Sequence, residues 1–298
     1  MATRSALLWL VTSIAVLASS GTAGAQPWTG ERWVRGRAHR VGGSAAFFGR
    51  EGGNLIDPGN GEQWAFSPSF EGRFRLVDEN AFHRDAFILD LDVAWRSVGA
   101  WGDADSFRVG NPYVGLRLGW RAPRWRLRFG AGTTAPLSNA FEDGGADRRA
   151  WQLGQALHGA WDPWLLEPEV QPLVLRGDFE LHGRYFQVGF DASLGVVFPL
   201  RRAGGGDTEY VFQTGAFGAA TPIPELALGG RFQLVFASDW RVGFGGDDEA
   251  QLALIPFVRV QLEPAFFELA LVMNLDDPYG FAFDDGVYAV LLKAGGRF

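Results

Sequence analysis

The chain has 298 residues, no cysteine and a formal net charge of −7. The negative charge excludes a general attraction to nucleic acid, and the absence of cysteine excludes both a disulfide framework and a lipid-modified cysteine anchor. Hydrophobic residues make up 47% of the chain and aromatic residues 14%, which suits either a soluble core or a lipid-facing surface.

The first 25 residues have the features of a secretory signal peptide. Arg4 supplies a positive start, residues 6–18 form an apolar run, and Ala23-Gly24-Ala25 resembles a cleavage site. No later apolar run reaches the ~18 residues of a transmembrane helix. We therefore expect an exported protein cleaved near Ala25, with residues 26–298 forming one domain.

Alternation of apolar and polar residues with a period of two predicts strands along the rest of the chain. It is clearest in residues 86–98, where Phe87, Leu89 and Leu91 oppose Asp90 and Asp92. The same pattern predicts about twelve strands, at residues 37–49, 62–77, 86–98, 107–121, 124–137, 171–182, 185–200, 208–221, 226–238, 250–262, 266–275 and 286–298.

The connections between these strands are alternately short and long. Ala122-Pro123 is a short one, whereas residues 138–170 form the longest. The last strand carries Tyr288 on an apolar face and ends on Phe298. A terminal strand ending in an aromatic residue, together with the signal, the alternation and the connection lengths, resembles the outer-membrane β-barrel proteins of Gram-negative bacteria.

This resemblance implies an all-β fold, a closed antiparallel transmembrane β-barrel with short periplasmic turns and longer extracellular loops. It also implies residence in the outer membrane, contact with its lipids and lipopolysaccharide, and recognition of Phe298 and Tyr288 by the barrel-assembly machinery. No motif in the sequence selects a porin, transporter or enzyme family within the class.

Closing the sheet in lipid turns the apolar face outward and the charged face toward the lumen. The inward charges near one predicted turn are the candidate residues of a lumen constriction: Arg117, Arg121, Arg124, Arg126, Arg128, Asp90, Asp92, Asp178 and Glu180. They could pair with one another in a hydrated lumen, or the arginines could form an electropositive constriction that selects anions. With Ala122-Pro123 as the turn, Arg117 should lie nearly opposite Arg128, and Arg121 opposite Arg124.

The long connection 138–170 contains a helical pattern followed by Asp162-Pro163. Two placements are open for this segment. Trp161 and Trp164 could anchor it at the outer membrane interface as part of an aromatic girdle, which is the placement that we expect. Alternatively, the segment could fold inward as a plug.

Catalysis is not expected. A lipase-like site needs a Ser/His pair with an orienting acid or amide. The sequence places no such triad-like set of residues around His39, His83, His158 or His182. Acidic clusters at residues 247–249, 276–277 and 284–285 match no calcium-loop spacing, so no metal or cofactor is expected.

The sequence therefore favours a narrow passive channel for small hydrophilic solutes, anionic ones if the arginines form a constriction. The alternative is a structural or surface-binding barrel that does not conduct.

Overall fold

The computed structural model describes residues 40–50, 63–79, 86–101, 105–122, 124–138, 145–200, 208–238, 250–262, 264–275 and 288–297. The expected signal peptide, His39, His83, Phe298 and the three acidic clusters lie outside these residues. Among the helices described, none combines the length and the hydropathy needed to span a bilayer.

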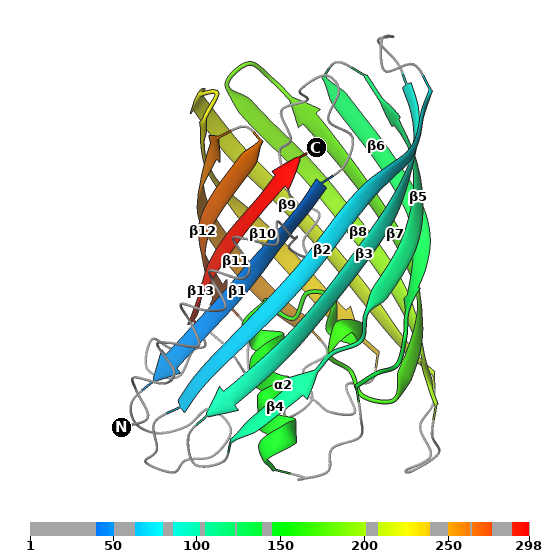
Figure 1. Cartoon of the computed structure of the whole chain (residues 1–298), viewed down its shortest axis with the longest axis vertical. Helices are drawn as coiled ribbons and strands as arrows, with labels where there is room; N and C mark the ends of the chain where they lie inside the picture. The colour runs from blue at the N-terminus through cyan, green and yellow to red at the C-terminus, as the bar shows by residue number, and fades with distance from the viewer. Residues whose placement is uncertain are drawn as a thin grey trace.

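Twelve of the strands form a closed antiparallel barrel (Figure 1). Their bounds are β1 (Arg40–Arg50), β2 (Gln63–Glu79), β3 (Ala86–Trp101), β5 (Tyr113–Arg121), β6 (Trp125–Thr134), β7 (Val170–His182), β8 (Phe186–Pro199), β9 (Glu209–Ile223), β10 (Leu226–Ala237), β11 (Ala250–Leu262), β12 (Ala265–Asn274) and β13 (Tyr288–Arg297).

The barrel closes because the first and last strands pair. β13 pairs with both β12 and β1, β1 pairs with β2, and the β2–β3 pairing completes the circle. Every spanning strand then has a partner on each side, which removes the unpaired edges of an open sheet. The predicted all-β closed barrel and its strand number are confirmed.

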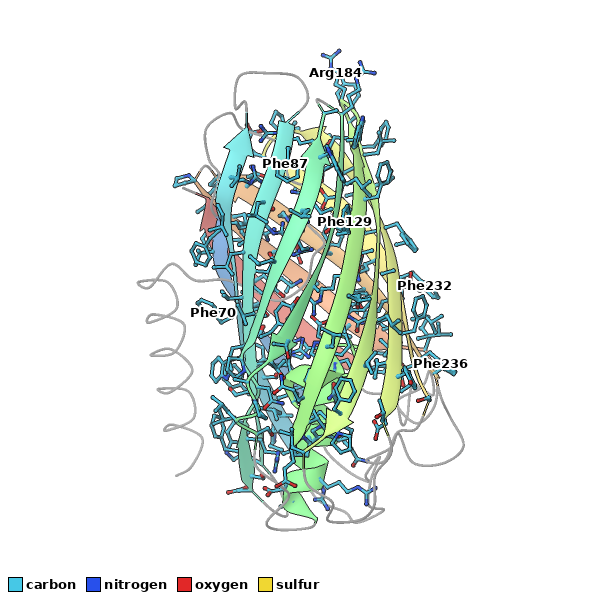
Figure 2. The ribbon with its side chains drawn as sticks, turned by 90° about the vertical axis from the view of Figure 1, so that its right-hand side faces the viewer. Phe70, Phe87, Phe129, Arg184, Phe232 and Phe236 are labelled. Carbon is cyan, nitrogen blue, oxygen red and sulfur yellow. The ribbon has the colours of Figure 1, made fainter. Side chains whose placement is uncertain are left out.

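Alternation along each strand separates an apolar outer wall from a polar inner wall. Leu116 and Phe190 are about half exposed on the outside, at 50% and 51%, whereas the Arg128 and Arg231 side chains are fully buried on the inside. Figure 2 shows Phe232 and Phe236 pointing away from the barrel. The predicted inward and outward faces are thus present in the structure.

Short and long connections gather at opposite ends of the barrel. One end, which we call the turn end, holds short links such as those between Arg121 and Trp125, His182 and Phe186, and Ile223 and Leu226. The other, the loop end, holds the longer connections, including the one from β6 to β7. Figure 2 shows Arg184 at the tip of the turn end.

The predicted strand 107–121 is two strands, which is a correction. β4 (Ser106–Val109) pairs only with the end of β3, and β5 begins at Tyr113. Between them Gly110 N–H donates to Arg96 O at 2.9 Å and Asn111 N–H turns inward to Leu165 O at 2.6 Å. Pro112 has no N–H to donate to a ladder, so the strand is interrupted there.

The β6–β7 connection carries two helices, α2 (Ala146–Ala156) and η1 (Pro163–Leu165). They lie at the loop end, partly behind β3 and β4 in Figure 1. Residues 145–169 are called the plug below, because their contacts place them inside the barrel.

Candidate functional site: the barrel interior

Opposite charges form a continuous chain, called the ion-pair network below, across five neighbouring strands of the inner wall. Asp92 accepts a hydrogen bond from Arg73 Nε at 3.0 Å and another from Arg117. Arg117 also donates to Asp178 Oδ1 at 2.7 Å, and Arg128 contacts Asp178 Oδ2 at 2.9 Å. All five side chains are buried, and each contacts a side chain of opposite charge within the wall.

The strand register brings these charges together. Opposite charges face each other directly across the ladders, in the pairs Arg73 with Asp92, Arg75 with Asp90, Asp90 with Arg117, Arg126 with Glu180 and Arg128 with Asp178. Directly opposed residues have neighbouring Cβ atoms, so unlike charges there attract. Arg75 Nε donates to Asp90 at 2.6 Å, and Arg126 donates to Glu180.

The predicted pairing of arginines across the β5–β6 turn is wrong, because the centre of the turn lies one residue later in the chain than expected. Ala122 N–H donates to Trp125 O at 2.9 Å, and Arg121 lies opposite Arg126 rather than Arg124. Arg117 accordingly faces Gly130, not Arg128. Alternation fixes the face on which a side chain lies, but the turn fixes its partner, and moving the turn by one residue shifts every pair by two positions.

The nine candidate lumen residues therefore divide into two groups. Arg117, Arg126, Arg128 and all four acids take part in the buried ion pairs, while Arg121 is half-buried at the end of β5. Arg124 is exposed at the turn end, apart from the network. The arginines do not form one unpaired constriction.

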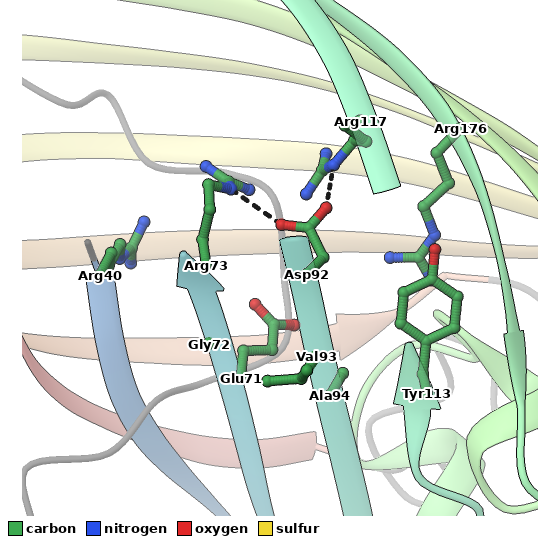
Figure 3. Close-up of a pocket in the computed structure, with 10 residues that line it drawn as sticks. All are labelled: Arg40, Glu71, Gly72, Arg73, Asp92, Val93, Ala94, Tyr113, Arg117 and Arg176. Atoms are coloured by element: carbon green, nitrogen blue, oxygen red, sulfur yellow. Dashed lines mark hydrogen bonds and ion pairs between the residues drawn. The ribbon is translucent and has the colours of Figure 1, made fainter. Parts of the chain in front are cut away.

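The central cavity is small. It has a volume of about 30 Å³, and its lining includes Glu71, Arg73, Asp92, Tyr113 and Arg117. Figure 3 shows Asp92 between the guanidinium groups of Arg73 and Arg117, with Glu71 beneath them. Such a volume holds about one or two water molecules, so side chains occupy most of the space around Asp92.

Wall side chains hold the plug by its backbone, from strands around the barrel. Arg96 on β3 donates to Trp161 O at 2.9 Å, and Gln233 on β10 donates to His158 O, also at 2.9 Å. Asn274 on β12 donates to Ala156 O at 3.0 Å.

The plug is also held at Asp162, through both its side chain and its backbone. Its carboxylate accepts hydrogen bonds from Arg176 and Gln213, both at 2.6 Å, and its N–H donates to Gln213 Oε1 at 3.0 Å. Asp162 adopts a left-handed backbone with φ 55°, as does neighbouring Ala160 with φ 57°. Non-glycine residues occupy this region at a cost, which the contacts at Asp162 offset.

Trp161 and Trp164 lie inside the barrel, so the expected aromatic-girdle placement is wrong and the inward fold is correct. Each has only 1% of its surface exposed. The Arg231 guanidinium lies 4.3 Å from the centre of the Trp161 ring. Trp164 packs against Gly195 of β8, where a Cβ would come within 2.7 Å of the indole. The wall is shaped around these two rings.

His158 has a serine partner that its sequence neighbours do not reveal. Its Nε2 lies 3.0 Å from Ser67 Oγ, and Ser67 Oγ donates to Ser97 O at 2.7 Å. The hydroxyl proton is directed to a backbone carbonyl at the place where the β2–β3 pairing skips Ser67 and Pro68. The imidazole must then donate to Ser67 rather than withdraw its proton, the reverse of what nucleophile activation requires. Burial, and next the charges of Arg96 and Lys293, lower the pKa of His158 well below its ordinary value of 6.5.

The residues that hold the plug were not singled out from the sequence. They include Arg96, Asp162, Arg176, Gln213, Gln233 and Asn274. A usable signal was present, because glutamine and asparagine stand at inward positions of β9, β10 and β12. In the described part of the chain, no group of three or more His, Cys, Asp or Glu side chains could hold a metal ion.

A comparison with protein-family models gives no match. A comparison with curated proteins gives none either.

Solved structures do match. An outer-membrane channel from Pseudomonas putida F1 aligns with 92% of this chain and 100% of its own, at a TM-score of 0.61 and 11% identity. The NanC porin aligns with 87% of this chain and 100% of its own, at a TM-score of 0.47 and 6% identity. The transport unit of the autotransporter AIDA-I from Escherichia coli aligns with 92% of this chain and 93% of its own, at a TM-score of 0.45 and 9% identity. At 11% identity the likeness to the Pseudomonas putida channel concerns the fold alone, and the chain has the fold of an outer-membrane β-barrel protein.

Proposed function

We propose that this protein is a channel of the Gram-negative outer membrane for small hydrophilic solutes, here in its closed state, and that the plug is its gate. In this proposal the chain is exported by a signal peptide cleaved near Ala25 and inserted by the barrel-assembly machinery with the help of Phe298. The turn end faces the periplasm, and the loop end faces lipopolysaccharide and the outside.

The observation that carries the proposal is the way the lumen is filled. Eight strands can fill a barrel with their own side chains, whereas sixteen leave an aqueous channel. This twelve-strand barrel lies between the two, and at its loop end a connection occupies the lumen. That connection is held by hydrogen bonds to polar wall residues such as Gln213 and Gln233. A wall polar enough to hold the plug is also one that water and small solutes would wet once the plug leaves.

A second candidate is a structural barrel that never conducts. The central cavity of about 30 Å³ favours it, as does the ion-pair chain from Arg73 to Arg128 across the lumen wall. Both candidates are consistent with a closed barrel, and neither includes catalysis, since the hydrogen bonds of Ser67 and His158 run in the direction opposite to a nucleophile and its base.

Planar-bilayer conductance distinguishes the two. In the test variant, residues 139–168 are replaced by a short Gly-Ser linker, and in the control the β8–β9 connection at residues 202–206 is replaced in the same way. If the protein is a gated channel, the plug variant conducts steadily, whereas the wild type and the control open rarely. A plug variant that folds, shown by heat-modifiable mobility, yet does not conduct would exclude the channel and leave the structural barrel.

A further inference from the structure

A second and larger cavity opens at the turn end, on the far side of the ion-pair network from the plug. Its volume is about 540 Å³, and its lining includes Arg124, His182, Arg184, Gln187, Arg259 and Gln261. We call it the vestibule. Cavities of about 300–1,000 Å³ are the usual size of small-molecule sites, so a small solute fits this one.

The inner part of the vestibule is built and charged. Arg259 is only 4% exposed and is held by Glu268, to which its Nε donates at 2.8 Å. His182 Nε2 lies 3.4 Å from Glu180 Oε2. Gln187 is buried beside them. Arg259 thus has a fixed carboxylate partner, and the three side chains together give the vestibule a polar floor.

The outer part carries positive charge without matching acid. Among the described residues, neither Arg124 nor Arg184 has a carboxylate partner, and the Arg184 guanidinium lies 4.9 Å from the centre of the Tyr185 ring. Glu225 is the one acidic residue among those that line the vestibule. Of the three arginines in the lining, Arg259 is paired with Glu268, which leaves Arg124 and Arg184 against the single carboxylate of Glu225.

This arrangement matches an anion. Guanidinium groups bind carboxylate and phosphate oxygens through paired hydrogen bonds. A concave site lined mainly by one sign of charge also focuses the field on a ligand of the opposite sign. The buried arginines of the central network cannot serve in this way, because Asp92 and Asp178 already occupy Arg117 and Arg128.

We propose that the vestibule binds a small organic or inorganic anion, with a carboxylate or phosphate group held between Arg124 and Arg184. This inference rests on the proposed function in one respect, that the bound anion passes through the lumen. Binding in the vestibule itself requires no open lumen. Selectivity for anions then comes from the turn-end mouth rather than from the paired arginines of the wall.

The test is calorimetric titration of the purified full-length mature protein in detergent at low salt, where screening is weak. The probes are succinate for carboxylates and inorganic phosphate for phosphates. Wild type should bind at least one of them with one site per barrel. Arg124→Gln and Arg184→Gln should each weaken binding at least about tenfold, the loss of one charge-assisted hydrogen bond.

Arg148→Gln is the matched control, because it removes one positive charge from an exposed position of α2 at the loop end. Its affinity should equal that of wild type. The proposal is overturned if neither probe binds, if the two vestibule variants bind like wild type, or if Arg148→Gln weakens binding as much as they do. A plug variant that conducts while no probe binds would remove the vestibule site and leave the channel. If a probe binds but the folded plug variant does not conduct, the vestibule site remains and the channel is excluded.

Discussion

At the scale of single residues, the interior depends on opposite charges placed directly across strand ladders. A buried ion pair adds little stability relative to an apolar pair of similar shape, but removing one partner leaves a buried charge unbalanced. Asp178 is shared by two arginines of different strands, Arg117 and Arg128.

Asp178→Asn should therefore lower the free energy of unfolding by about 3–5 kcal/mol. Urea titration of the protein in detergent or lipid measures the change. Glu225→Gln, at an exposed carboxylate of the β9–β10 turn, is the control and should leave stability nearly unchanged. Equal effects of the two substitutions would mean that the network contributes no stability at this position.

Gly195 leaves the space that the Trp164 indole fills. Gly195→Leu should displace the indole and loosen the plug, because its Cβ alone would lie 2.7 Å from the ring. The chain has no cysteine, so Ala156→Cys, at a fully buried plug position, gives a single reporter thiol. We expect Gly195→Leu to increase its rate of maleimide labelling at least severalfold.

Gly218→Leu is the matched control for Gly195→Leu. Gly218 is exposed on the outer wall, and a Cβ added there would have Val188 as its nearest neighbour, at 4.0 Å. The labelling rate should stay at its wild-type value in this variant. If Gly195→Leu also leaves the rate unchanged, Trp164 does not hold the plug in place.

At the scale of elements, each strand is defined by its two faces, and the β11–β12 and β2–β3 ladders are interrupted beside a proline, which has no N–H to donate. The β11–β12 pairing skips Ile255 and Pro256. The β2–β3 pairing skips Ser67 and Pro68, and there the Ser67 hydroxyl takes over as donor to Ser97 O. Side chains thus replace a missing backbone donor inside the wall, as the exclusion of water from lipid-facing backbone requires.

The outward face of β5 gives a prediction for the whole sheet. Leu116 lies at the middle of β5 with half its surface exposed, so Leu116→Arg should cost about 2–4 kcal/mol in a bilayer if the residue is near the midplane. Urea unfolding in lipid vesicles measures the cost against Leu116→Ala, which removes the side chain without adding charge. An arginine variant as stable as the alanine variant would mean that this face does not lie in lipid.

At the scale of the whole molecule, the plug links the loop end to strands all round the barrel, and His158 makes that link sensitive to pH. The buried imidazole has its pKa lowered by burial and by Arg96 and Lys293, whereas a displaced plug would return it to an ordinary value near 6.5. The displaced state therefore binds protons more readily. The seated plug keeps its full stability above pH 6.5 and loses it as the pH falls below that value.

We accordingly expect acidification from about pH 7.5 to 5 to increase labelling of the Ala156→Cys thiol, after normalisation to an exposed Gly145→Cys reference at the same pH. His158→Gln should remove this pH dependence, because glutamine does not titrate. Equal pH dependence with and without the imidazole would assign the effect to another group.

The sequence by itself determined the barrel. The period of two separates Leu116 from Arg117 whatever the rest of the chain does, because neighbouring residues of a strand point to opposite faces. A connection too short to cross the barrel, such as that between Leu262 and Ala265, makes neighbours of consecutive strands. Strand number, antiparallel order and the assignment of inner and outer faces follow from such local patterns.

Only the tertiary structure decided what lies in the interior. The partner of Arg117 depends on where the β5–β6 turn closes, and the partners of Trp161 and His158 come from strands distant in sequence. Alternation carries no information about distances across a barrel, and a buried tryptophan has the same sequence pattern as one at a membrane interface. The plug and the pairing of the arginines therefore emerge only when the sheet closes and brings β2, β9, β10 and β12 around residues 145–169.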